Sequence, residues 1–380
     1  MPTLRRFRFL TLLLPVFFIF ASCEKEFSVS ESSDTTTTTT VSSETCPSLD
    51  AHLIEAAVEQ VSDRTQLLQY FTEAQIADLH ANACLARELP EGLTERASGL
   101  KNRFWSPGAT IRVRFLNGSA ALRQKVFSWA KEWENYANVH FTEVASGASE
   151  VRVLFGNDGH WSYIGTDNSG IEACDETMAL ELTDATQASE IRRVALHEFG
   201  HVLGLRHEHQ QPLASIPWNT NAVYTYYAQQ DWSRDEVDQQ VLNKTTAESS
   251  QYTNFDASSI MEYPVPASLT TNGYYIGWNT QLSASDKSYI NLMYSSQRMR
   301  IRHAASGYNS NITFQLAGIY HTVKLGETMN VPAVSGTNAL AIYEQSAGSW
   351  VWDNAYAPVY GKNYKIVRVG NTNNLTLQAE

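Results

Sequence analysis

The sequence predicts an α+β fold, in which a mixed body over residues 101–296 is followed by a small all-β module over residues 297–380. Two observations support this division. In the body, alternating apolar and polar stretches are interspersed with stretches that carry apolar residues every three or four positions. In the module, only short strand-like stretches occur, separated by glycine, asparagine and serine. A chain of 380 residues is long enough to bury a core in each part.

Three strands are predicted in the body. Each is a short stretch in which apolar residues are continuous or alternate with polar ones, at residues 110–116, 151–155 and 177–182. The middle stretch, VRVLF, is interpreted as a strand that presents an edge to an extended peptide, which would bind with little demand on its sequence.

Three helices are predicted between and after these strands. The first covers residues 120–139, where apolar side chains recur at helical spacing at Leu122, Val126, Trp129 and Trp133. The second is expected to begin near Ser189, a residue type that commonly caps a helix N-terminus. The third closes the body over residues 283–294.

The first 100 residues are predicted to form three consecutive segments. Residues 1–22 carry basic residues, then an apolar run, then small residues, which is typical of a signal peptide; a retained membrane anchor is the alternative. Cys23 follows directly and resembles the lipidation site of bacterial lipoproteins. Residues 23–46 are rich in serine and threonine and are interpreted as a flexible tether. Residues 47–100 have a helical pattern and are interpreted as an N-terminal segment, with a prosegment as one hypothesis.

Charge and cysteine content limit the partners and the compartment. The net charge is −12, and the first 22 residues hold three arginines and no acid, so the remainder of the chain carries −15. Such an acidic protein is not expected to have nucleic acid or anionic lipid as its main partner. From the signal-like N-terminus and Cys23 we expect an exported protein, displayed on the cell surface or outer membrane as a lipoprotein or else secreted, that contacts membrane only through a lipid anchor. We also expect it to be a monomer. If Cys23 is lipidated, at most one disulfide can form among Cys46, Cys84 and Cys174, and the sequence does not choose the pair.

One short stretch, HEFGHVLGLRH, contains a motif that is typical of a zinc site. His197 and His201 are four positions apart, so a helix places both imidazoles on one face, where they can reach one tetrahedral metal ion. Glu198 comes directly after the first histidine and is expected to act as a general base on water at the metal. Gly204 can end the helix and turn the chain, which would return His207 as a third ligand and leave the fourth position open.

The full spacing HExxHxxGxxH is far more specific than its first five residues alone, and it predicts one catalytic zinc ion. His209 matches no ligand spacing, so it is predicted to be a surface residue or to support the ligands from outside the metal site. The other six histidines, at positions 52, 80, 140, 160, 303 and 321, are scattered along the chain and are assigned no metal role.

The motif resembles that of the metzincin metallopeptidases, which also carry a methionine turn further along the chain. The stretch SSIMEYP, residues 258–264, matches that turn. Glu208 directly after the third histidine, and Tyr263 two residues after the methionine, narrow the resemblance to the astacin branch. WSYIG, residues 161–165, is also similar to a stretch of astacin catalytic domains. The resemblance covers residues 101–296 and implies a metzincin fold, with a twisted sheet, an active-site helix and two subdomains around a cleft.

The resemblance also implies an activity, that of a zinc endopeptidase that hydrolyses peptide bonds in proteins and peptides. In such an enzyme zinc lowers the pKa of water to about 7, and a carboxylate takes the proton as the hydroxide attacks the peptide carbonyl. The matching residues here are His197, His201 and His207 as ligands and Glu198 as the base.

Three further residues acquire roles only through this resemblance. Met261 would form an apolar floor beneath the metal. Tyr263 would be a fifth zinc ligand that moves off the metal and hydrogen-bonds the tetrahedral intermediate. The family's counterpart of Glu208 helps to bind the new N-terminus after activation cleavage.

The chain departs from the astacin pattern at several positions. His160 stands where a cysteine normally precedes the WSYIG stretch, Glu262 replaces the common histidine after the methionine, and Pro264 replaces glycine. The two disulfides usual in the family cannot both form with three cysteines. These differences leave the metal motif intact and concern the disulfide scaffold and the shape of the pocket.

Two other functions compete with the enzyme. One is a non-catalytic surface adhesion lipoprotein that keeps a structural zinc site, which an intact Glu198 argues against because zinc binding alone requires no base. In the other, the β module has the main function and binds glycan through the aromatic residues of SWVWDNAYAPVY, residues 349–360. Packing in the core is the simpler interpretation of those aromatic residues. Cys84 is interpreted as disulfide-bonded or buried in preference to binding zinc in a latent form.

Overall fold

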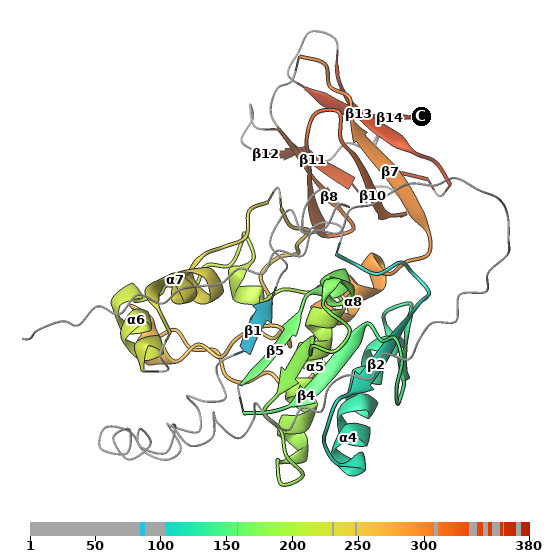
Figure 1. Cartoon of the computed structure of the whole chain (residues 1–380). Helices are drawn as coiled ribbons and strands as arrows, with labels where there is room; N and C mark the ends of the chain where they lie inside the picture. The colour runs from blue at the N-terminus through green and yellow to red at the C-terminus, as the bar shows by residue number, and fades with distance from the viewer. Residues whose placement is uncertain are drawn as a thin grey trace, which may run out of the picture. The chain divides into compact units, whose positions relative to one another are not determined.

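The computed structural model, drawn in Figure 1, describes residues 84–87, 103–157, 159–229, 232–247, 249–307, 311–333, 340–344, 349–351, 358–359, 361–369 and 374–380. The predicted signal peptide (1–22), the tether (23–46) with Cys23, and most of the segment 47–100 lie outside the described residues. Within the described ranges, no helix combines the length and the apolar character needed to cross a membrane.

A six-stranded sheet organises the body. Its strand order is β1-β5-β6-β4-β2-β3, in which β5 and β6 are antiparallel and all other neighbours are parallel. The bounds are β1 Cys84–Arg87, β2 Ala109–Phe115, β3 Val139–Glu143, β4 Val151–Phe155, β5 His160–Tyr163 and β6 Met178–Leu180. Sheet and helices together confirm the predicted α+β class.

Two helices pack with this sheet around the largest core of the described residues. Helix α4 (Ala120–Ala130) begins at Ser119, whose side chain accepts the Leu122 N–H at 3.0 Å. Helix α5 (Ala188–Val202) is buried along most of its length, and the 3₁₀ turn η4 (Lys131–Asn135) is tied to it by the indole of Trp133, which donates to the Leu196 carbonyl at 3.0 Å. The burial of α5 on nearly every side fixes the position of the motif that it carries.

The remaining helices follow α5 in the chain. Helices α6 and α7 share a small aromatic-rich core of their own, and α8 begins with a capping box at Ser283 and Asp286. Their bounds are α6 Thr220–Ala228, α7 Arg234–Val237 and α8 Ala284–Met293. The 3₁₀ turns are η5 Gly165–Gly170, η6 Glu208–Gln210 and η8 Ala267–Leu269, and η7 (Asp238–Leu242) is a π-helix.

The C-terminal residues form two four-stranded sheets, with orders β10-β7-β13-β14 and β12-β11-β8-β9. Alternate residues of these strands build a separate core, which includes Ile301, Phe314 and Ile366. The bounds are β7 Arg298–His303, β8 Ile312–Leu316, β9 Ile319–Val323, β10 Thr328–Pro332, β11 Leu340–Glu344, β12 Ser349–Val351, β13 Tyr364–Arg368 and β14 Leu375–Ala379.

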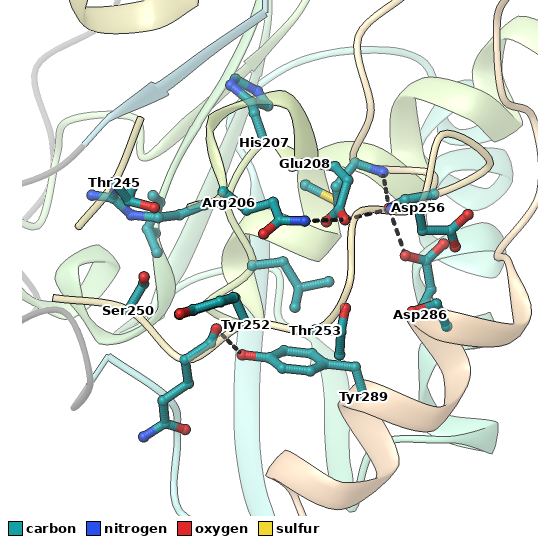
Figure 2. Close-up of a pocket in the computed structure, with 18 of the residues that line it drawn as sticks. Arg206, His207, Glu208, Thr245, Ser250, Tyr252, Thr253, Asp256, Asp286 and Tyr289 are labelled. Carbon is teal, nitrogen blue, oxygen red and sulfur yellow. Dashed lines mark hydrogen bonds between the residues drawn. The ribbon is translucent and has the colours of Figure 1, made fainter. Parts of the chain in front are cut away.

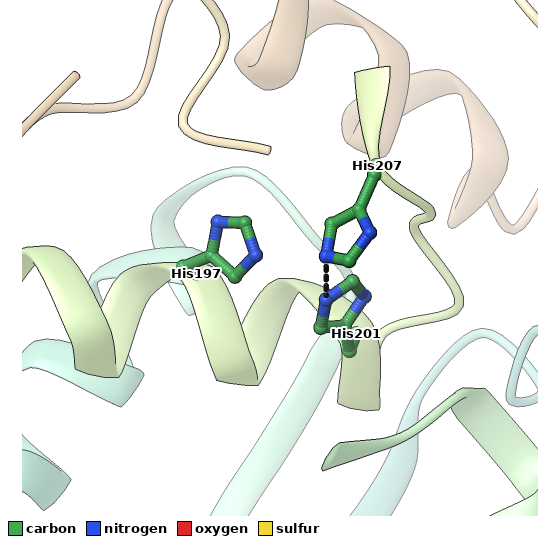
Figure 3. Close-up of side chains that lie close together, drawn as sticks. All are labelled: His197, His201 and His207. Atoms are coloured by element: carbon green, nitrogen blue, oxygen red, sulfur yellow. Dashed lines mark hydrogen bonds between the residues drawn. The ribbon is translucent and has the colours of Figure 1, made fainter. Parts of the chain in front are cut away.

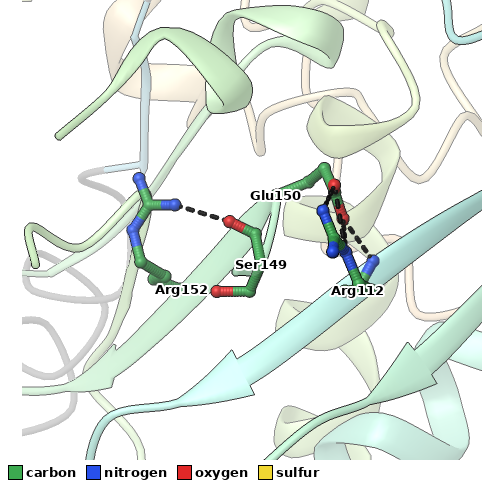
Figure 4. A network of polar contacts seen from close by, with 4 residues as sticks. All are labelled: Arg112, Ser149, Glu150 and Arg152. Atoms are coloured by element: carbon green, nitrogen blue, oxygen red, sulfur yellow. Dashed lines mark hydrogen bonds and ion pairs between the residues drawn. The ribbon is translucent and has the colours of Figure 1, made fainter. Parts of the chain in front are cut away.

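Two arginines on neighbouring strands of the body have contrasting surroundings (Figure 4). Arg152 on β4 is 3% exposed and donates to the backbone carbonyls of Ser149, Ile171 and Asp175. Arg112 on β2 is exposed and forms an ion pair with Glu150. The buried guanidinium of Arg152 therefore holds the loop before β6 to the sheet. Cys174, which lies in the same loop, is disulfide-bonded.

Three local predictions were wrong. Residues 84–87, expected to be helical, form β1, because the edge of β5 offers backbone hydrogen bonds that override helix propensity. VRVLF is β4 and lies between β6 and β2, so it has no edge for a peptide; β5 is the strand next to β1. The N-cap of α5 is Gln187, without a side-chain capping bond, and Ser189 lies inside the helix.

Candidate functional site

Helix α5 carries the first part of the zinc motif at its C-terminal end. His197, Glu198 and His201 are all at most 4% exposed. The four-residue spacing puts the two imidazoles on adjacent turns of one face, with ring centroids 4.9 Å apart. Glu198 lies between them in the sequence and is 1% exposed, so its side chain is buried within the protein.

Gly204 turns the chain at the end of the helix. Its φ is +92°, in the left-handed region that favours glycine. The Gly204 N–H donates to the His201 carbonyl at 2.8 Å, and the Leu205 N–H donates to the Gly200 carbonyl at 3.0 Å. These bonds satisfy the last helical carbonyls and reverse the chain, which returns His207 to the same site.

The three histidines lie together, as Figure 3 shows. One ligand atom from each of His197, His201 and His207 lies within 4.8 Å of the others, and all three side chains are buried. The Nε2 atoms of His201 and His207 are 3.0 Å apart. Ligands of a tetrahedral zinc ion, each about 2.0–2.1 Å from the metal, are about 3.3 Å apart, which is close to the separation of the His201 and His207 Nε2 atoms.

Hydrogen bonds from the backbone orient two of the three rings. The Nδ1 atom of His197 is 2.7 Å from the Ile260 carbonyl, and that of His201 is 2.9 Å from the Leu205 carbonyl. Because a carbonyl only accepts, each Nδ1 carries the proton and each Nε2 presents its lone pair. The His197 Nε2 is buried and has no partner among the described residues, which fits a metal ligand.

Burial also keeps the three imidazoles neutral. It lowers the pKa of His201 to about 4, and it lowers the pKa of His197 and His207 well below 6.5, with the neighbouring histidines adding to the effect. Neutral imidazole is the form that binds zinc, so the electrostatics of the site and its geometry agree.

The segment that carries Met261 packs against the helix that carries His197 and His201. Met261 is 2% exposed, and a Cβ added at Gly200 would overlap its sulfur, so the helix backbone and this side chain are in close contact. The Glu208 N–H donates to the Met261 carbonyl at 3.0 Å, which joins this segment to the end of the histidine motif. Gly200 therefore has a packing role that the sequence pattern does not reveal.

Asp286 on α8 anchors the same segment. Its carboxylate accepts from the Ser259 hydroxyl at 2.6 Å and from the Ile260 N–H at 2.8 Å. Because the Ile260 carbonyl in turn bonds His197, a continuous chain of hydrogen bonds joins α8 to a histidine of the triad. No motif in the sequence marked Asp286, which lies 26 residues beyond Ile260 in the chain.

Tyr263 also lies against the histidines. Its ring centroid is 4.2 Å from that of His207 and 6.3 Å from that of His197, and the residue is 5% exposed. The structure thus brings the predicted tyrosine to the triad.

Glu208 lines a cavity of about 90 Å³ (Figure 2). Its Oε1 accepts from the Asp256 N–H at 2.9 Å, and burial raises the pKa of this carboxyl to about 7. Arg103, Tyr252 and Tyr289 are among the residues that line the cavity. A cationic group that entered the cavity would pair with the Glu208 carboxylate and offset the cost of burying that charge.

Two residues that depart from the astacin pattern are both buried. His160 on β5 is 6% exposed, and its Nδ1 accepts the Glu181 N–H at 3.0 Å. Glu262 is 3% exposed, and burial, with the charge of Glu208, raises the pKa of its carboxyl well above 4.5. Neither residue is placed in the metal triad.

His209 is not a surface residue. It is 2% exposed, and its ring stacks on those of His207 and Tyr263, with centroid distances of 5.4 and 4.6 Å. Burial lowers its pKa to about 4. Of the two positions expected for His209, the surface position is therefore wrong, and the residue instead packs against a predicted zinc ligand, His207.

Comparison with known proteins finds relatives of this chain. The model of the astacin peptidase family matches residues 98–295 of the chain. A solved structure of myroilysin is 41% identical and aligns with 52% of this chain and 97% of that chain, with a TM-score of 0.50. No curated protein sequence matches.

Two further solved structures are similar to this chain. A second crystal structure of myroilysin is 39% identical over 55% of this chain and 89% of that chain, with a TM-score of 0.43. High choriolytic enzyme 1, a hatching enzyme zinc-protease from the medaka fish Oryzias latipes, is 17% identical over 51% of this chain and 95% of that chain, with a TM-score of 0.36.

Proposed function

The chain belongs to the astacin family of zinc metalloendopeptidases, and we propose that His197, His201 and His207 hold its single catalytic zinc ion while Glu198 is the general base. The observation that carries this proposal is the buried triad of neutral imidazoles, whose ligand atoms lie within 4.8 Å of one another. When bound, zinc supplies a Lewis acid that activates water and polarises the scissile carbonyl.

Glu198 moves the proton in this mechanism. It takes a proton from the attacking water and then delivers it to the nitrogen of the leaving amine. Its place between two ligands on one helix supports this role, because α5 fixes the carboxyl group relative to the triad. Burial of the site excludes bulk water, which strengthens the electrostatic interactions made there.

Tyr263 donates its phenolic hydrogen bond to the oxyanion that develops during attack. The ring of Tyr263 lies 4.2 Å from that of His207, which places this tyrosine directly beside a proposed zinc ligand. Met261 supports the triad from below through its contact with Gly200.

The N-terminal regions complete the proposal. Residues 1–22 direct export, Cys23 carries a lipid and residues 23–46 hold the folded parts away from the membrane. Residues 47–100 form a prosegment, which the pairing of β1 along β5 supports, since an added strand there competes with an extended substrate. After cleavage, the new N-terminal ammonium group enters the cavity of Glu208, as the family resemblance implies.

Residues 101–296 form the catalytic domain and residues 297–380 a separate β module. The rival hypothesis, a non-catalytic adhesion or glycan-binding lipoprotein with a structural zinc site, is disfavoured by the buried carboxyl group of Glu198 beside the triad. A structural site normally has four protein ligands, whereas the triad offers three.

Chelation and zinc return test the proposal. The purified protein is prepared in two forms, the intact chain and the chain from which limited proteolysis has removed the N-terminal segment. Each form is incubated with casein in the absence and in the presence of a zinc chelator. We expect cleavage by the processed protein, loss of that cleavage on chelation and recovery on adding one equivalent of zinc. Processed protein that contains zinc and leaves casein intact would refute the enzymatic function.

A further inference from the structure

His209 occupies an unusual position directly beyond the triad. It lies in the 3₁₀ turn η6, is 2% exposed, and its Nε2 is 2.9 Å from the Gln240 carbonyl oxygen. Because that oxygen only accepts, the Nε2–H of His209 donates the bond. The imidazole is therefore held at one edge by a directed hydrogen bond.

The acceptor belongs to a π-helix. In η7 the Asn243 N–H bonds the Asp238 carbonyl, five residues earlier, at 2.7 Å. Single turns of π-helix occur frequently at functional sites, and they change which backbone carbonyls are available to other groups. Gln210 uses the same turn, since its side-chain amide donates to the Gln239 carbonyl at 2.6 Å. Two successive residues of η6 are thus tied to η7.

One face of the His209 ring lies against the site. Its centroid is 4.6 Å from that of Tyr263 with an interplanar angle of 29°, and 5.4 Å from that of His207 with an angle of 18°. Tyr263 contacts His207 as well, at 4.2 Å. Two imidazoles thus pack against the tyrosine ring, and the one that is not in the metal triad is fixed by the π-helix.

We infer that His209 is a positioning residue, which holds the ring of Tyr263 in the orientation required for catalysis. The inference rests on the proposed role of Tyr263. A stacked ring alone would fill the space, but it could rotate in its plane; the bond to Gln240 fixes the imidazole and thereby the surface on which Tyr263 packs. His209 acts through Tyr263 and contacts neither metal nor substrate.

A double-mutant cycle tests this inference. The variants are His209→Ala, Tyr263→Phe and the double variant, with His140→Ala as a control at an exposed histidine of β3. We expect His209→Ala to lower kcat about 5- to 10-fold, with KM and zinc content unchanged, and to have no further effect when Tyr263 is already Phe. His140→Ala should retain wild-type kcat.

Two more measurements guard against a simple loss of structure. His209→Phe keeps a ring of similar size and lacks the hydrogen bond, so it should fold and still show a reduced kcat. In protein labelled with ¹³C in the tyrosine rings, the resonance that disappears in Tyr263→Phe belongs to Tyr263. This resonance should shift in His209→Phe and stay in place in His140→Ala.

The outcomes separate the inference from the proposed function. If Tyr263→Phe is as active as wild type, the proposed role of Tyr263 is wrong and the inference falls with it. Tyr263→Phe can have a reduced kcat while the His209→Ala substitution lowers kcat by the same factor in the Tyr263→Phe background as in wild type. In that case Tyr263 keeps its role and only the inference is overturned. An unchanged Tyr263 resonance in His209→Phe would also overturn the inference.

Discussion

Asp286 links helix α8 to the metal site through a short chain of hydrogen bonds. Its carboxylate accepts from the Ser259 hydroxyl, from the Ile260 N–H and from the Ser283 N–H, at 2.6, 2.8 and 2.8 Å. The Ile260 carbonyl then bonds the Nδ1 of His197 at 2.7 Å. Replacement of Asp286 should therefore affect both folding stability and zinc affinity.

The expected magnitude follows from the groups that lose their partner. Asp286→Ala leaves the Ser259 hydroxyl and the Ile260 N–H without an acceptor inside the protein, while the Ser283 N–H lies nearer to solvent. Each of these two buried groups costs about 1–3 kcal/mol when it is left unsatisfied, so we expect a loss of about 2–6 kcal/mol in the free energy of unfolding. Loss of an interaction behind a metal ligand should weaken zinc binding by about 10- to 100-fold.

Asp286→Asn is the matched control. The amide has the same shape and can still accept from the two backbone N–H groups while it donates to Ser259. Burial raises the pKa of Asp286, so removal of the charge also removes a desolvation cost, and the loss of stability should be about 1 kcal/mol.

Urea unfolding of the zinc-free proteins measures the stability, and competition with a chromogenic chelator measures zinc affinity. An Asp286→Ala variant with wild-type stability and wild-type zinc affinity would refute the claim that α8 supports the triad. Equal losses in the Ala and Asn variants would show that charge is the important property and hydrogen-bond geometry is not.

Two other predictions concern the body. Arg152→Met should lower the free energy of unfolding by about 3 kcal/mol or more, because three buried carbonyls lose their donor, whereas Arg112→Gln should cost at most about 1 kcal/mol; equal urea midpoints for the two variants would contradict this. His160 has a pKa lowered to about 4, chiefly by burial, so it stabilises the fold above pH 6.5 and this contribution is lost as the pH falls toward 4. Relative to His160→Asn, wild type should therefore lose about 2 kcal/mol of unfolding free energy when the pH is lowered from 7 to 5. If the difference between the two proteins does not change with pH, the buried imidazole is not neutral as inferred.

Regular elements with strong local patterns could be predicted from the sequence. The alternation in residues 110–116 and the helical stripe after it correspond to β2 and α4, and Ser283 does begin α8. The strand β1 could not be predicted, because its residues favour a helix and only the edge of β5 makes them extended. The position of β4 inside the sheet could not be predicted from the sequence either, because strand order depends on contacts between distant segments.

In the site, too, features set by local sequence could be predicted and features set by distant contacts could not. Ligand spacing, a property of one helix and one turn, was sufficient to predict that His197, His201 and His207 come together. Asp286 was missed, and the bond of His209 to Gln240 could not be foreseen, because the partners Ile260 and Gln240 are 26 and 31 residues away in the chain. No local pattern encodes such pairs.

The most direct test of the central claim is a measurement of zinc content and peptide cleavage on one preparation of Glu198→Gln. The account predicts one zinc ion per chain, as in wild type, because three histidines hold the metal. Cleavage should fall about 10²- to 10⁴-fold, since the base that moves the proton is gone. A variant that retains zinc and cleaves at the wild-type rate would contradict the account.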